Sequence, residues 1–553
     1  MTYARSLLDA LLLTKGPCLL SMPREKTFNA PSVDRLNVTL RTHAKIRASM
    51  SGEGVTLADQ IQDAMLRALA DERFDPIVRA DIESISIELW IQTSAREISS
   101  SERDAIDAIS LGLEGAEVEW SDAFAYYKPS VALTSGFTTS QELLSALCKK
   151  AGLFPDAWRL AACTVRRTTW VHLCEVGKAQ FSELEGLRVK RNDRINRDAI
   201  EDLLNRSVSY LINNQKVDGT YFYSWNPLHN KTVCQHPNSV RASGCAYAMA
   251  LAANSNELAD RGSALKSALA ANDAILKGTI SWHDGLIVPE RGAERFTWGK
   301  LGSTALLAAS LVTPSMHERR PQETDNLFRS LLGAQRDDGS FRCFFGSNRI
   351  EHKAADFYPG EALLALVLRA EQGDMKCLAS VELAFRSHRD YFRKQPNSAF
   401  IGWHADVWAR ASRLSSQRSA MISFVFEQLD WLAAFQIKQT SDRASGAFRP
   451  PHSSRPGVAS VVYTEAIIRG LDLAAKSGNM DRCRRYRNVA IESLKFCLNL
   501  SLSKEQSIFF ESPSRALGGM TSGLTDFEVR SDHVQHTITL ALAALDAWEL
   551  LTD

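Results

Sequence analysis

The 553-residue sequence has no excess of either charge, no long hydrophobic run and no CxxC pair. Its 65 basic and 64 acidic residues leave a net charge of +1, so it lacks the basic surface with which nucleic-acid binders neutralise phosphates. Without a run of about 18 apolar residues, no transmembrane span is expected. The ten cysteines are scattered, several of them in apolar helical runs, which favours a reducing cytoplasm over a disulfide framework or a zinc knuckle.

What is present is typical of a globular protein, with 45% hydrophobic and 23% charged residues. The length predicts more than one domain. The opening segment MTYARSLLDALLLTKGPCLL contains an apolar stretch, but Asp9 interrupts it and only Arg5 precedes it. This segment is therefore interpreted as an amphipathic helix rather than a signal peptide, and the protein is expected to be cytoplasmic.

In residues 1–185, segments whose apolar residues alternate as in strands are interspersed with segments whose apolar residues recur at helical spacing. LNVTLRTHAKIRASMSG alternates as a pair of strands around Thr42–His43, and ESISIELWIQTS and CTVRRTTWVHLCEV alternate as further strands. ADQIQDAMLRALAD has helical spacing, and TSQELLSALCKKAG begins with a capping pattern and ends at Gly152. The sequence predicts an α+β domain here.

Three segments of this region resemble the AMMECR family, in the family's order: ALADERFDPIVRADIESISIELWI, SLGLEGAEVEW and ELLSALCKKAGLFPDAW. The family's Leu-Arg-Gly-Cys-Ile-Gly signature would fall on Ile46–Ser51. Arg47 matches, whereas Ser49 stands at the cysteine position and Ala48 and Ser51 replace the glycines.

The resemblance implies a fold and little function, because the family's biochemical role is poorly defined. A docking or binding module is the favoured interpretation of the first domain, with a possible protein partner. An active site built around Arg47 and Ser49 is the alternative, although a serine needs a nearby base to become a nucleophile at neutral pH.

Residues 186–198 are polar and form a predicted linker, and the rest, 199–553, is almost entirely helical. Six segments rich in Ala, Gly, Ser and Leu recur, a composition that suits fully buried helices. They are 240–253, 300–312, 359–370, 405–414, 463–474 and 533–548.

Amphipathic helices alternate with the buried ones, at about 199–214, 260–276, 322–335, 376–394, 417–436 and 481–500. Twelve such helices predict six hairpins with the apolar set inside, either as a closed (α/α)6 toroid or as an open solenoid. Closure is favoured, because six hairpins is the number that closes the inner barrel of known toroids. The region resembles six-hairpin glycosidases and terpene-cyclase-like toroids.

Three outer helices end in related loops, each with a glutamine followed by a glycine and an aromatic residue. The glutamines are Gln215, Gln335 and Gln436. Such loops resemble the QW motif of triterpene cyclases, and they are interpreted as structural staples: the glutamine ties the helix end to the next turn, and glycine permits positive φ.

Chemistry is expected where the inner helices begin, because their N-terminal ends should converge on one funnel. The partial positive charge of helix N-termini favours anionic groups there. The predicted catalytic residues are Asp406, Glu361, His404, His536 and Asp532, and the predicted substrate-binding residues are Arg241, Lys300, Tyr358, Trp403 and Glu465.

Several reactions fit these residues. Asp406 with Glu361 or Glu465 would supply the acid and base of glycosidic chemistry, with tryptophans as sugar-stacking faces. Lyase or epimerase chemistry on uronic acids, with Arg241 and Lys300 on the carboxylate, is equally open. A buried Glu361 or Glu465 would otherwise be a helix cap.

Other classes fit poorly. Asp532-His533-x-x-His536 lacks a third metal ligand, so no metal and no cofactor is expected. Arg336-Asp337-Asp338-Gly339 is a poor match to a terpene-cyclase acid motif and lies in an outer-helix loop. The sequence therefore predicts an enzyme, a hydrolase or a lyase/epimerase, that acts on a carbohydrate-like or other polar or anionic small molecule or polymer. The AMMECR-like domain is expected to dock or gate. The alternative is a scaffold that grips a peptide or small ligand without turnover.

Overall fold

The computed structural model describes residues 1–14, 33–42, 44–103, 105, 108–177, 180–190, 195–234, 238–290, 298–346, 354–440, 442–451, 453 and 455–552. The end of the predicted first helix, His43 of the predicted turn and part of the predicted linker lie outside these ranges. The chain forms two compact units. The first comprises Met1–Arg191, Pro227–Asn230 and Ser503–Pro513, and the second comprises Asn192–Asn226, Lys231–Leu502 and Ser514–Asp553.

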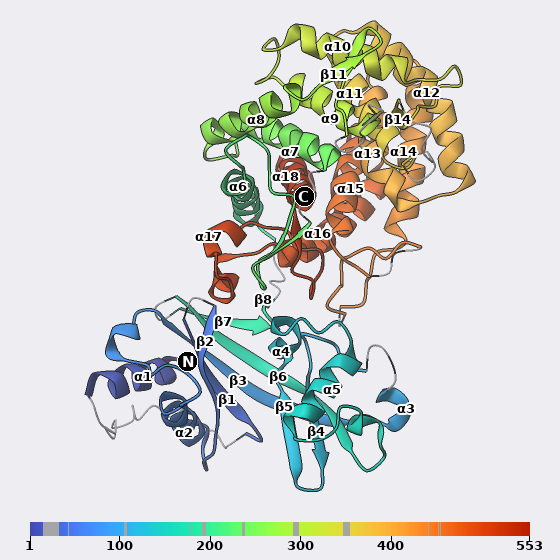
Figure 1. The fold of residues 1–553 in the computed structure, drawn as a ribbon. Helices are drawn as coiled ribbons and strands as arrows, with labels where there is room; N and C mark the ends of the chain where they lie inside the picture. The colour runs from blue at the N-terminus through green and yellow to red at the C-terminus, as the bar shows by residue number, and fades with distance from the viewer. Residues whose placement is uncertain are drawn as a thin grey trace. The chain divides into compact units, whose positions relative to one another are not determined.

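The first unit is built on an antiparallel sheet with strand order β2-β1-β3-β6-β4-β5, to which β7 and β8 are added beside β6 (Figure 1). Its strands are β1 (Leu36–Thr42), β2 (Lys45–Gly52), β3 (Ile85–Glu97), β4 (Gly115–Trp120), β5 (Ala123–Tyr127), β6 (Thr164–Gly177), β7 (Gln180–Glu185) and β8 (Arg188–Val189). β8 falls within the stretch that the sequence assigns to a linker.

One face of β1–β3 is apolar and carries a core of the first unit. Val38, Leu40 and Ile87 pack there against α1 (Thr2–Thr14) and α2 (Leu57–Leu69). A second core lies under α5 (Ser140–Lys150), whose N-terminus is closed by a capping box between Thr139 and Glu142, as the sequence predicts. The α+β class is thereby confirmed, whereas the β4–β5 hairpin was not predicted as strands.

The opposite face of β1–β3 is polar, because the alternate residues of each strand are polar. Asn37, Thr39 and Arg41 of β1 pair in register with Trp90, Glu88 and Ser86 of β3, so their side chains share one face. The 3-10 helix η4 (Lys504–Phe509) belongs to this unit, and its Phe509 ring lies 5.1 Å from the Arg41 guanidinium.

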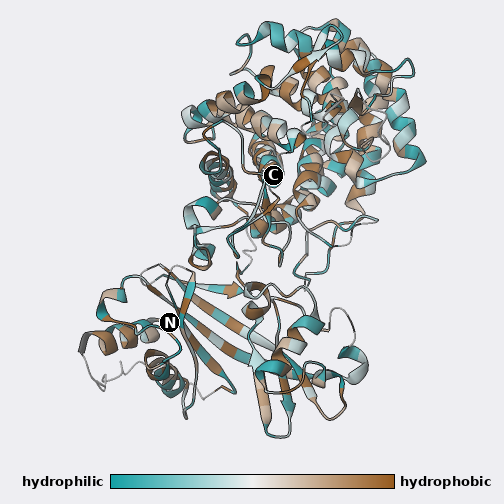
Figure 2. Cartoon of the chain, in the orientation of Figure 1, coloured by the Kyte–Doolittle hydropathy of each residue, from teal (hydrophilic) through white to brown (hydrophobic). Residues whose placement is uncertain are grey.

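The second unit is a closed (α/α)6 toroid. Its inner helices are α7 (Ser239–Ala253), α9 (Leu301–Leu311), α11 (Tyr358–Glu371), α13 (Ser398–Ala411), α15 (Ala459–Lys476) and α18 (Ser531–Asp546). Each packs against the next, and α18 packs against α7, so the first and last hairpins touch. α9 is buried on every side, and Figure 2 shows hydrophobic residues concentrated on these helices. The prediction of closure rather than a solenoid is confirmed.

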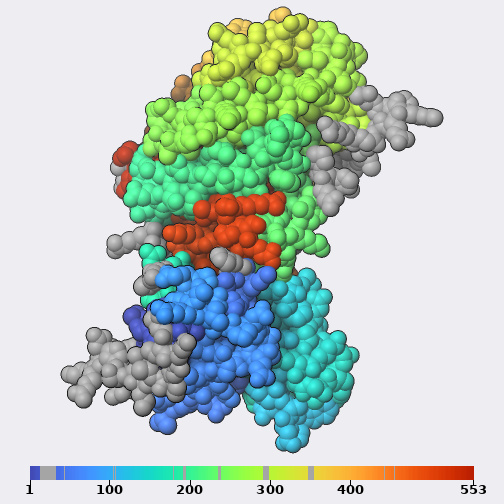
Figure 3. Space-filling model, turned by 60° about the vertical axis from the view of Figure 1, so that its left-hand side comes forward, coloured from blue at the N-terminus to red at the C-terminus, as the bar shows by residue number. Residues whose placement is uncertain are grey.

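The outer helices are α6 (Arg197–Asn213), α8 (Arg261–Leu276), α10 (Pro321–Gly333), α12 (Met375–Lys394), α14 (Arg418–Ala433) and α16 (Met480–Leu500). The end of α6 is tied to the C-terminal part of the chain. The Asn213 side chain donates to the carbonyl of Ser514, and Arg515 donates to Asn214 at 2.8 Å. Figure 3 shows these teal and red segments side by side on the surface.

The predicted staples are present at the ends of α6, α10 and α14. Nε2 of Gln215 donates to the carbonyl of Gly219 in its own loop and to that of Ser267 on α8, both at 2.9 Å. Gln335 and Gln436 make the same pair of contacts. Each donates to the carbonyl of its loop glycine and to a carbonyl of the next outer helix, which is α12 for Gln335 and α16 for Gln436. The loop glycines have φ between +84° and +88°, which only glycine adopts readily.

Candidate active site in the toroid

Three inner helices turn polar side chains toward the interior of the ring. On α13, Trp403, Asp406 and Arg410 follow one another at three- and four-residue intervals, which places them on one helix face. Glu465 and Arg469 do the same on α15. In an otherwise apolar helix, this spacing produces a polar stripe that faces the middle of the ring.

These side chains line a cavity of 380 Å³. The cavity lies among the inner helices of the second unit and is also lined by Tyr247 of α7 and by His536 and Thr539 of α18. A second hollow of 240 Å³ shares Asp406, Arg410 and Arg469 with it and adds further basic side chains, Arg413 and Lys476. The toroid therefore has a polar interior site bordered by arginines.

Asp406 is held ionised in this cavity. Burial favours the neutral form of its carboxyl group, but Arg410 at 2.9 Å and Arg469 at 3.9 Å outweigh burial and hold the pKa of Asp406 below its ordinary value. Arg410 also pairs with Glu371 at 3.1 Å. Asp406 thus keeps a negative charge at neutral pH, between two positive ones.

Glu465 has the opposite character. Burial raises its pKa to about 7, and the positive charge of Arg469 only partly offsets this. The hydroxyl of Thr539 donates to Oε2 of Glu465 at 2.6 Å, which fixes the carboxyl group in place. Glu465 is therefore able to hold or release a proton at neutral pH.

His536 and Trp403 form the third part of the site. Their ring centroids are 5.2 Å apart, and both side chains line the cavity. Burial lowers the pKa of His536 to about 4, so its ring is neutral at pH 7 and has one nitrogen able to accept a proton. The Trp403 ring offers an aromatic wall.

The structure divides the predicted funnel into two groups. Asp406, Glu465, His536 and Trp403 meet in the cavity, whereas Arg241, Lys300, Tyr358, Glu361 and Asp532 lie near the beginnings of their helices and do not line it. The cavity is formed by the middle and C-terminal turns of the inner helices. The expectation of one funnel at the N-terminal ends is therefore corrected.

Helix boundaries explain this difference. α13 begins at Ser398, where Asn397 is the N-cap, so Asp406 lies well inside the helix and is not at its opening. α15 begins at Ala459, which likewise removes Glu465 from the first turn and excludes a capping role for it. Arg410 lies in the last turn of α13, where its positive charge complements the negative end of the helix dipole.

The residues near the helix beginnings are engaged with one another. Asp532 pairs with Arg530 at 2.5 Å and with Arg241 at 3.1 Å, and these pairs outweigh burial and hold its pKa far below the ordinary range. Lys300 pairs with Glu290 at 3.1 Å. Asp532 is therefore a permanent anion rather than an acid or base.

Glu361 in the first turn of α11 is the exception. It is 1% exposed, and its Oε2 has no hydrogen-bond partner within the described ranges. Burial raises the pKa of Glu361 to about 7, against the opposing charges of Arg241 and Lys300. It is a buried carboxyl group that is largely neutral below pH 7.

The structure places His404 in the core of the toroid and not among the cavity-lining residues. It is fully buried and stacks on Phe400 with a centroid distance of 3.6 Å and an interplanar angle of 3°. His388 of α12 and Trp408 complete this aromatic cluster, which packs between the inner and outer helices. Burial holds the pKa of His404 well below its ordinary value, so it acts as an aromatic core residue.

The lining residues that sequence reasoning missed include Tyr247, Arg410, Arg469, Thr539 and Asp546. The signal that identifies them is the helical interval from residues already chosen. Arg410 follows Asp406 by one turn, Arg469 follows Glu465 by one turn, and Thr539 follows His536 by three residues.

The two candidates in the first unit lie on β2. The Arg47 guanidinium is engaged by the carbonyls of Asp75 and Pro76 and by the Asp81 carboxylate at 3.5 Å. Ser49 faces the polar side of the sheet, where its Oγ lies 3.1 Å from Oγ1 of Thr39. The two side chains therefore have separate surroundings.

Comparison with known proteins agrees with the fold of the first unit. Residues 38–170 match the family model AMMECR1. These residues form an AMMECR1 domain. Protein TV1384 of Thermoplasma volcanium is 32% identical to the chain over 108 residues, which cover 20% of this chain and 51% of that protein. The chain thus spans about half the length of the curated relatives that its AMMECR1 domain matches.

The toroid has its own similar structures. A D-mannose isomerase is 10% identical with a TM-score of 0.48, and the match covers 64% of this chain and 98% of the isomerase. An unsaturated glucuronyl hydrolase specific for heparin is 10% identical with a TM-score of 0.46, covering 64% and 99% of the two chains. Among the described residues, no helix is both long and apolar enough to span a membrane.

Proposed function

We propose that the toroid cavity is an active site that acts on a carbohydrate-like substrate by acid–base chemistry, with Glu465 as the proton donor. The observation that carries this proposal is the pair of carboxyl groups in one cavity with opposite pKa shifts. Two carboxyl groups whose pKa values are pushed apart divide the roles of acid and anion between them. Glu465, with a pKa of about 7, takes the first role, and Asp406 takes the second.

The cavity wall suits a ring bearing hydroxyl groups. Trp403 and Tyr247 supply aromatic faces, and Arg410 and Arg469 supply donors for hydroxyl or carboxylate oxygens. A volume of 380 Å³ is within the usual range of small-molecule sites, about 300–1,000 Å³. The substrate we propose is a sugar, including sugars that carry a carboxylate.

The proton transfers follow from the assigned states. Glu465 donates its proton to a glycosidic or carbonyl oxygen of the substrate as negative charge develops on that oxygen. Asp406 stabilises developing positive charge or orients hydroxyl groups, because the two arginines make it a weak base. Neutral His536 accepts a proton from the substrate or from water. Cleavage and epimerisation both begin with this arrangement.

The test is turnover of a panel of sugars and uronic acids by the full chain in D2O, followed by NMR. Deuterium entering a carbon position reports epimerase or isomerase chemistry, and new reducing ends report hydrolysis. Glu465→Gln should lower turnover by about 10²-fold or more without a change in folding. The matched control is Glu427→Gln on outer helix α14, where the carboxylate pairs with Arg393 at 2.6 Å; it should leave turnover unchanged.

A second candidate function is binding without turnover. It is favoured by the ion pairs of Asp406, because an acid held between Arg410 and Arg469 suits a recognition site as well as a catalytic one. Two results together would establish this function instead. Calorimetry would show that a sugar binds equally well to the wild-type chain and to Glu465→Gln, and NMR would show no product and no deuterium incorporation with the wild-type chain. Docking or gating by the AMMECR1 domain stays a prediction.

A further inference from the structure

The polar face of the first unit contains a cluster that neither the toroid chemistry nor the fold requires. Lys128 follows β5 and precedes the short helix α4 (Pro129–Thr134), and its Nζ reaches across to β1 and β2. Nζ lies 2.6 Å from Oδ1 of Asn37, 2.6 Å from Oγ1 of Thr39 and 3.2 Å from Oγ of Ser49. Three oxygen atoms therefore surround one amine nitrogen.

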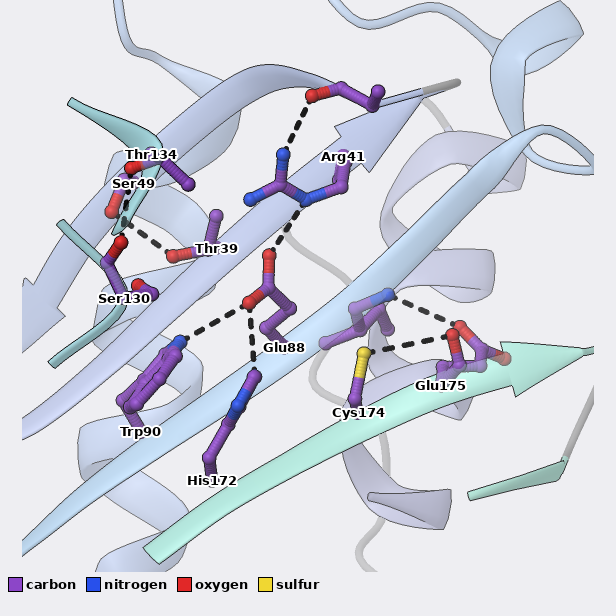
Figure 4. Close-up of polar contacts among 12 residues, drawn as sticks. Thr39, Arg41, Ser49, Glu88, Trp90, Ser130, Thr134, His172, Cys174 and Glu175 are labelled. Atoms are coloured by element: carbon purple, nitrogen blue, oxygen red, sulfur yellow. Dashed lines mark hydrogen bonds and ion pairs between the residues drawn. The ribbon is translucent and has the colours of Figure 1, made fainter. Parts of the chain in front are cut away.

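The register of the sheet creates this cluster. Thr39 pairs directly with Ser49 across β1 and β2, and with Glu88 across β1 and β3, so all three side chains lie on the polar face. Figure 4 shows Thr39 and Ser49 directed toward each other, beside the network of Arg41, Glu88, Trp90 and His172. Arg41 pairs with Glu88 at 2.9 Å, and His172 Nε2 lies 2.9 Å from the same carboxylate.

Nζ donates to all three oxygen atoms, and the Ser49 hydroxyl donates to Oδ1 of Asn37 at 3.2 Å. A neutral lysine has two N–H donors and one lone pair. When Lys128 is neutral, Asn37 and Thr39 can take the two donors, and the lone pair is then within 3.2 Å of Ser49 Oγ. Trp90 supports the amine from one side, with its ring centroid 5.5 Å from Nζ.

We propose that Ser49 is a nucleophile with Lys128 as its general base, and that this pair hydrolyses carboxylic esters. Serine with lysine is one of the arrangements in which a hydroxyl group is activated by an adjacent base. Asn37 and Thr39 are positioning residues that orient the amine. The sequence alone favours a docking module here because no base for Ser49 is visible in it; the fold supplies one from a residue 79 positions away.

Electrostatics supports the base role of Lys128. Burial lowers its pKa to about 7; the carboxylate of Glu88 opposes this effect, while the charges of Arg41 and Lys150 reinforce it. A substantial fraction of Lys128 is therefore neutral at physiological pH. The Ser49 and Lys128 side chains are both partly exposed.

Aromatic side chains are available to hold an acyl group on the same face. Tyr126 donates to or accepts from Ser51 Oγ at 2.6 Å, and its ring stacks near Trp170 with a centroid distance of 5.8 Å. The Trp90 ring beside Lys128 is buried and stacked on His172, so it supports the amine and leaves the acyl group to Tyr126 and Trp170. The substrate class that fits is an ester with an apolar or aromatic acyl group.

The reaction is balanced by the two residues and water. Ser49 Oγ forms a bond to the ester carbonyl carbon as its proton passes to Lys128 Nζ. The tetrahedral adduct expels the alkoxide, which takes that proton and leaves as an alcohol. Water then attacks the acyl-serine and gives a proton to Nζ, and this proton returns to Ser49 Oγ as the carboxylic acid departs.

The experiment uses the full chain with a p-nitrophenyl ester and with a fluorophosphonate that labels activated serines. We expect ester hydrolysis and a phosphonate adduct on the peptide that contains Ser49, and a loss of both by about 10²-fold or more in Ser49→Ala. Ser94→Ala on β3 is the matched control, because it removes an exposed serine hydroxyl from the same sheet, where Ser94 bonds to Thr169 at 2.7 Å; it should retain activity within about twofold. An adduct elsewhere, or unchanged hydrolysis in Ser49→Ala, overturns the proposal.

The base is tested by pH. The labelling rate should rise with pH and level off above about 7, because only neutral Lys128 accepts the serine proton. Lys128→Arg, which keeps the charge but stays protonated, should abolish this inflection and lower the rate by about 10²-fold. If Lys128→Arg fails to fold, the wild-type pH profile decides: a rate independent of pH from 5 to 9 contradicts the assignment. Trapping of Lys128 by an aldehyde and borohydride with no label on Ser49 would make the lysine the nucleophile and also contradict it.

Discussion

Buried carboxyl groups are treated differently in the two units. In the AMMECR1 domain, Glu88 is surrounded by Arg41, His172 and the Trp90 indole N–H, and these partners outweigh burial and hold its pKa far below the ordinary range. In the toroid, burial dominates and raises the pKa of Glu361 and Glu465 to about 7.

The contrast separates structural from chemical use of a buried acid. Glu88 is a permanent anion that joins β1, β3 and β6, and no change near neutral pH affects it. The toroid carboxyl groups change charge within the physiological range, where a proton donor is useful. Which partners surround an acid therefore decides whether it holds strands together or exchanges protons.

The largest effect is expected from removing the partner of Glu88. Arg41→Leu leaves a buried carboxylate without its main cation, and we expect a loss of about 3–5 kcal/mol in the free energy of unfolding of the first unit. Hydrogen exchange of β3 peptides, measured beside toroid peptides, resolves the unit affected. Equal protection of β3 in the wild type and the variant would show that Glu88 is not held by this pair.

Glu361 should behave in the opposite way. The pKa of Glu361 is about 7 in the folded state, above the ordinary value of 4.5. Between these two pH values the unfolded state therefore binds fewer protons than the folded state. As a result, the stability of the toroid falls as pH rises from about 4.5 to 7. Glu361→Gln removes this loss: at pH 8 it should be more stable than the wild type by up to about 3 kcal/mol, and at pH 4 nearly equal. Denaturant titrations at both pH values measure the difference. A variant that is less stable at pH 8 would mean that Glu361 is paired as Glu88 is.

Asp406 extends the comparison between paired and unpaired acids into the toroid, because it is a carboxylate paired with arginines that also lines the cavity. Asp406→Asn should lower turnover by about 10²-fold with little change in thermal stability, if its charge serves the reaction. Asp430→Asn is the matched control, since Asp430 pairs with Arg482 at 2.9 Å between outer helices, away from the cavity-lining residues. Proportionate losses of stability and activity in Asp406→Asn would make Asp406 structural. His536→Gln is the companion variant.

The smallest effect is expected at a staple. Gln335→Ala removes the hydrogen bonds that Gln335 donates to the carbonyls of Gly339 and Ser380 and the one that it accepts from Oγ of Ser380. It should cost about 1–2 kcal/mol of toroid stability with no loss of turnover. Thermal unfolding and the sugar assay measure both. A loss of turnover greater than the loss of folded protein would give the staple a role in the cavity.

Much of the fold was predictable because its signals are local. The capping box of Thr139 and Glu142 needs only residues three apart, and the staple loops need only a glutamine, a glycine and an aromatic residue in order. The alternation of apolar and amphipathic segments was enough to predict the hairpins and their inner and outer roles. The start of α13 was missed by about two turns, because the bulky Phe, Ile and Trp side chains of SAFIGWH interrupt its small residues.

The site was predicted less completely. Four predicted residues do line one cavity: Asp406, Glu465, His536 and Trp403. They were expected to meet at the N-terminal ends of the inner helices, but they meet because they lie on the helix faces that line the cavity. His404 lies one residue from Trp403, and the helical rotation of about 100° between them turns it into the aromatic core. When a helix is buried on every side, its sequence does not show which face lines the cavity.

The chain's own pattern determined the α+β domain, the hairpin ring, its staples and the residues able to carry charge, since each depends on intervals of a few residues. Tertiary packing alone decided which charges meet. It placed Arg410 and Arg469 beside Asp406, left Glu465 with a single hydroxyl donor, and brought Lys128 to Ser49. The physical reason is that a pKa depends on burial and on charges within a few ångströms, and those distances exist only after the chain has closed its sheet and its ring.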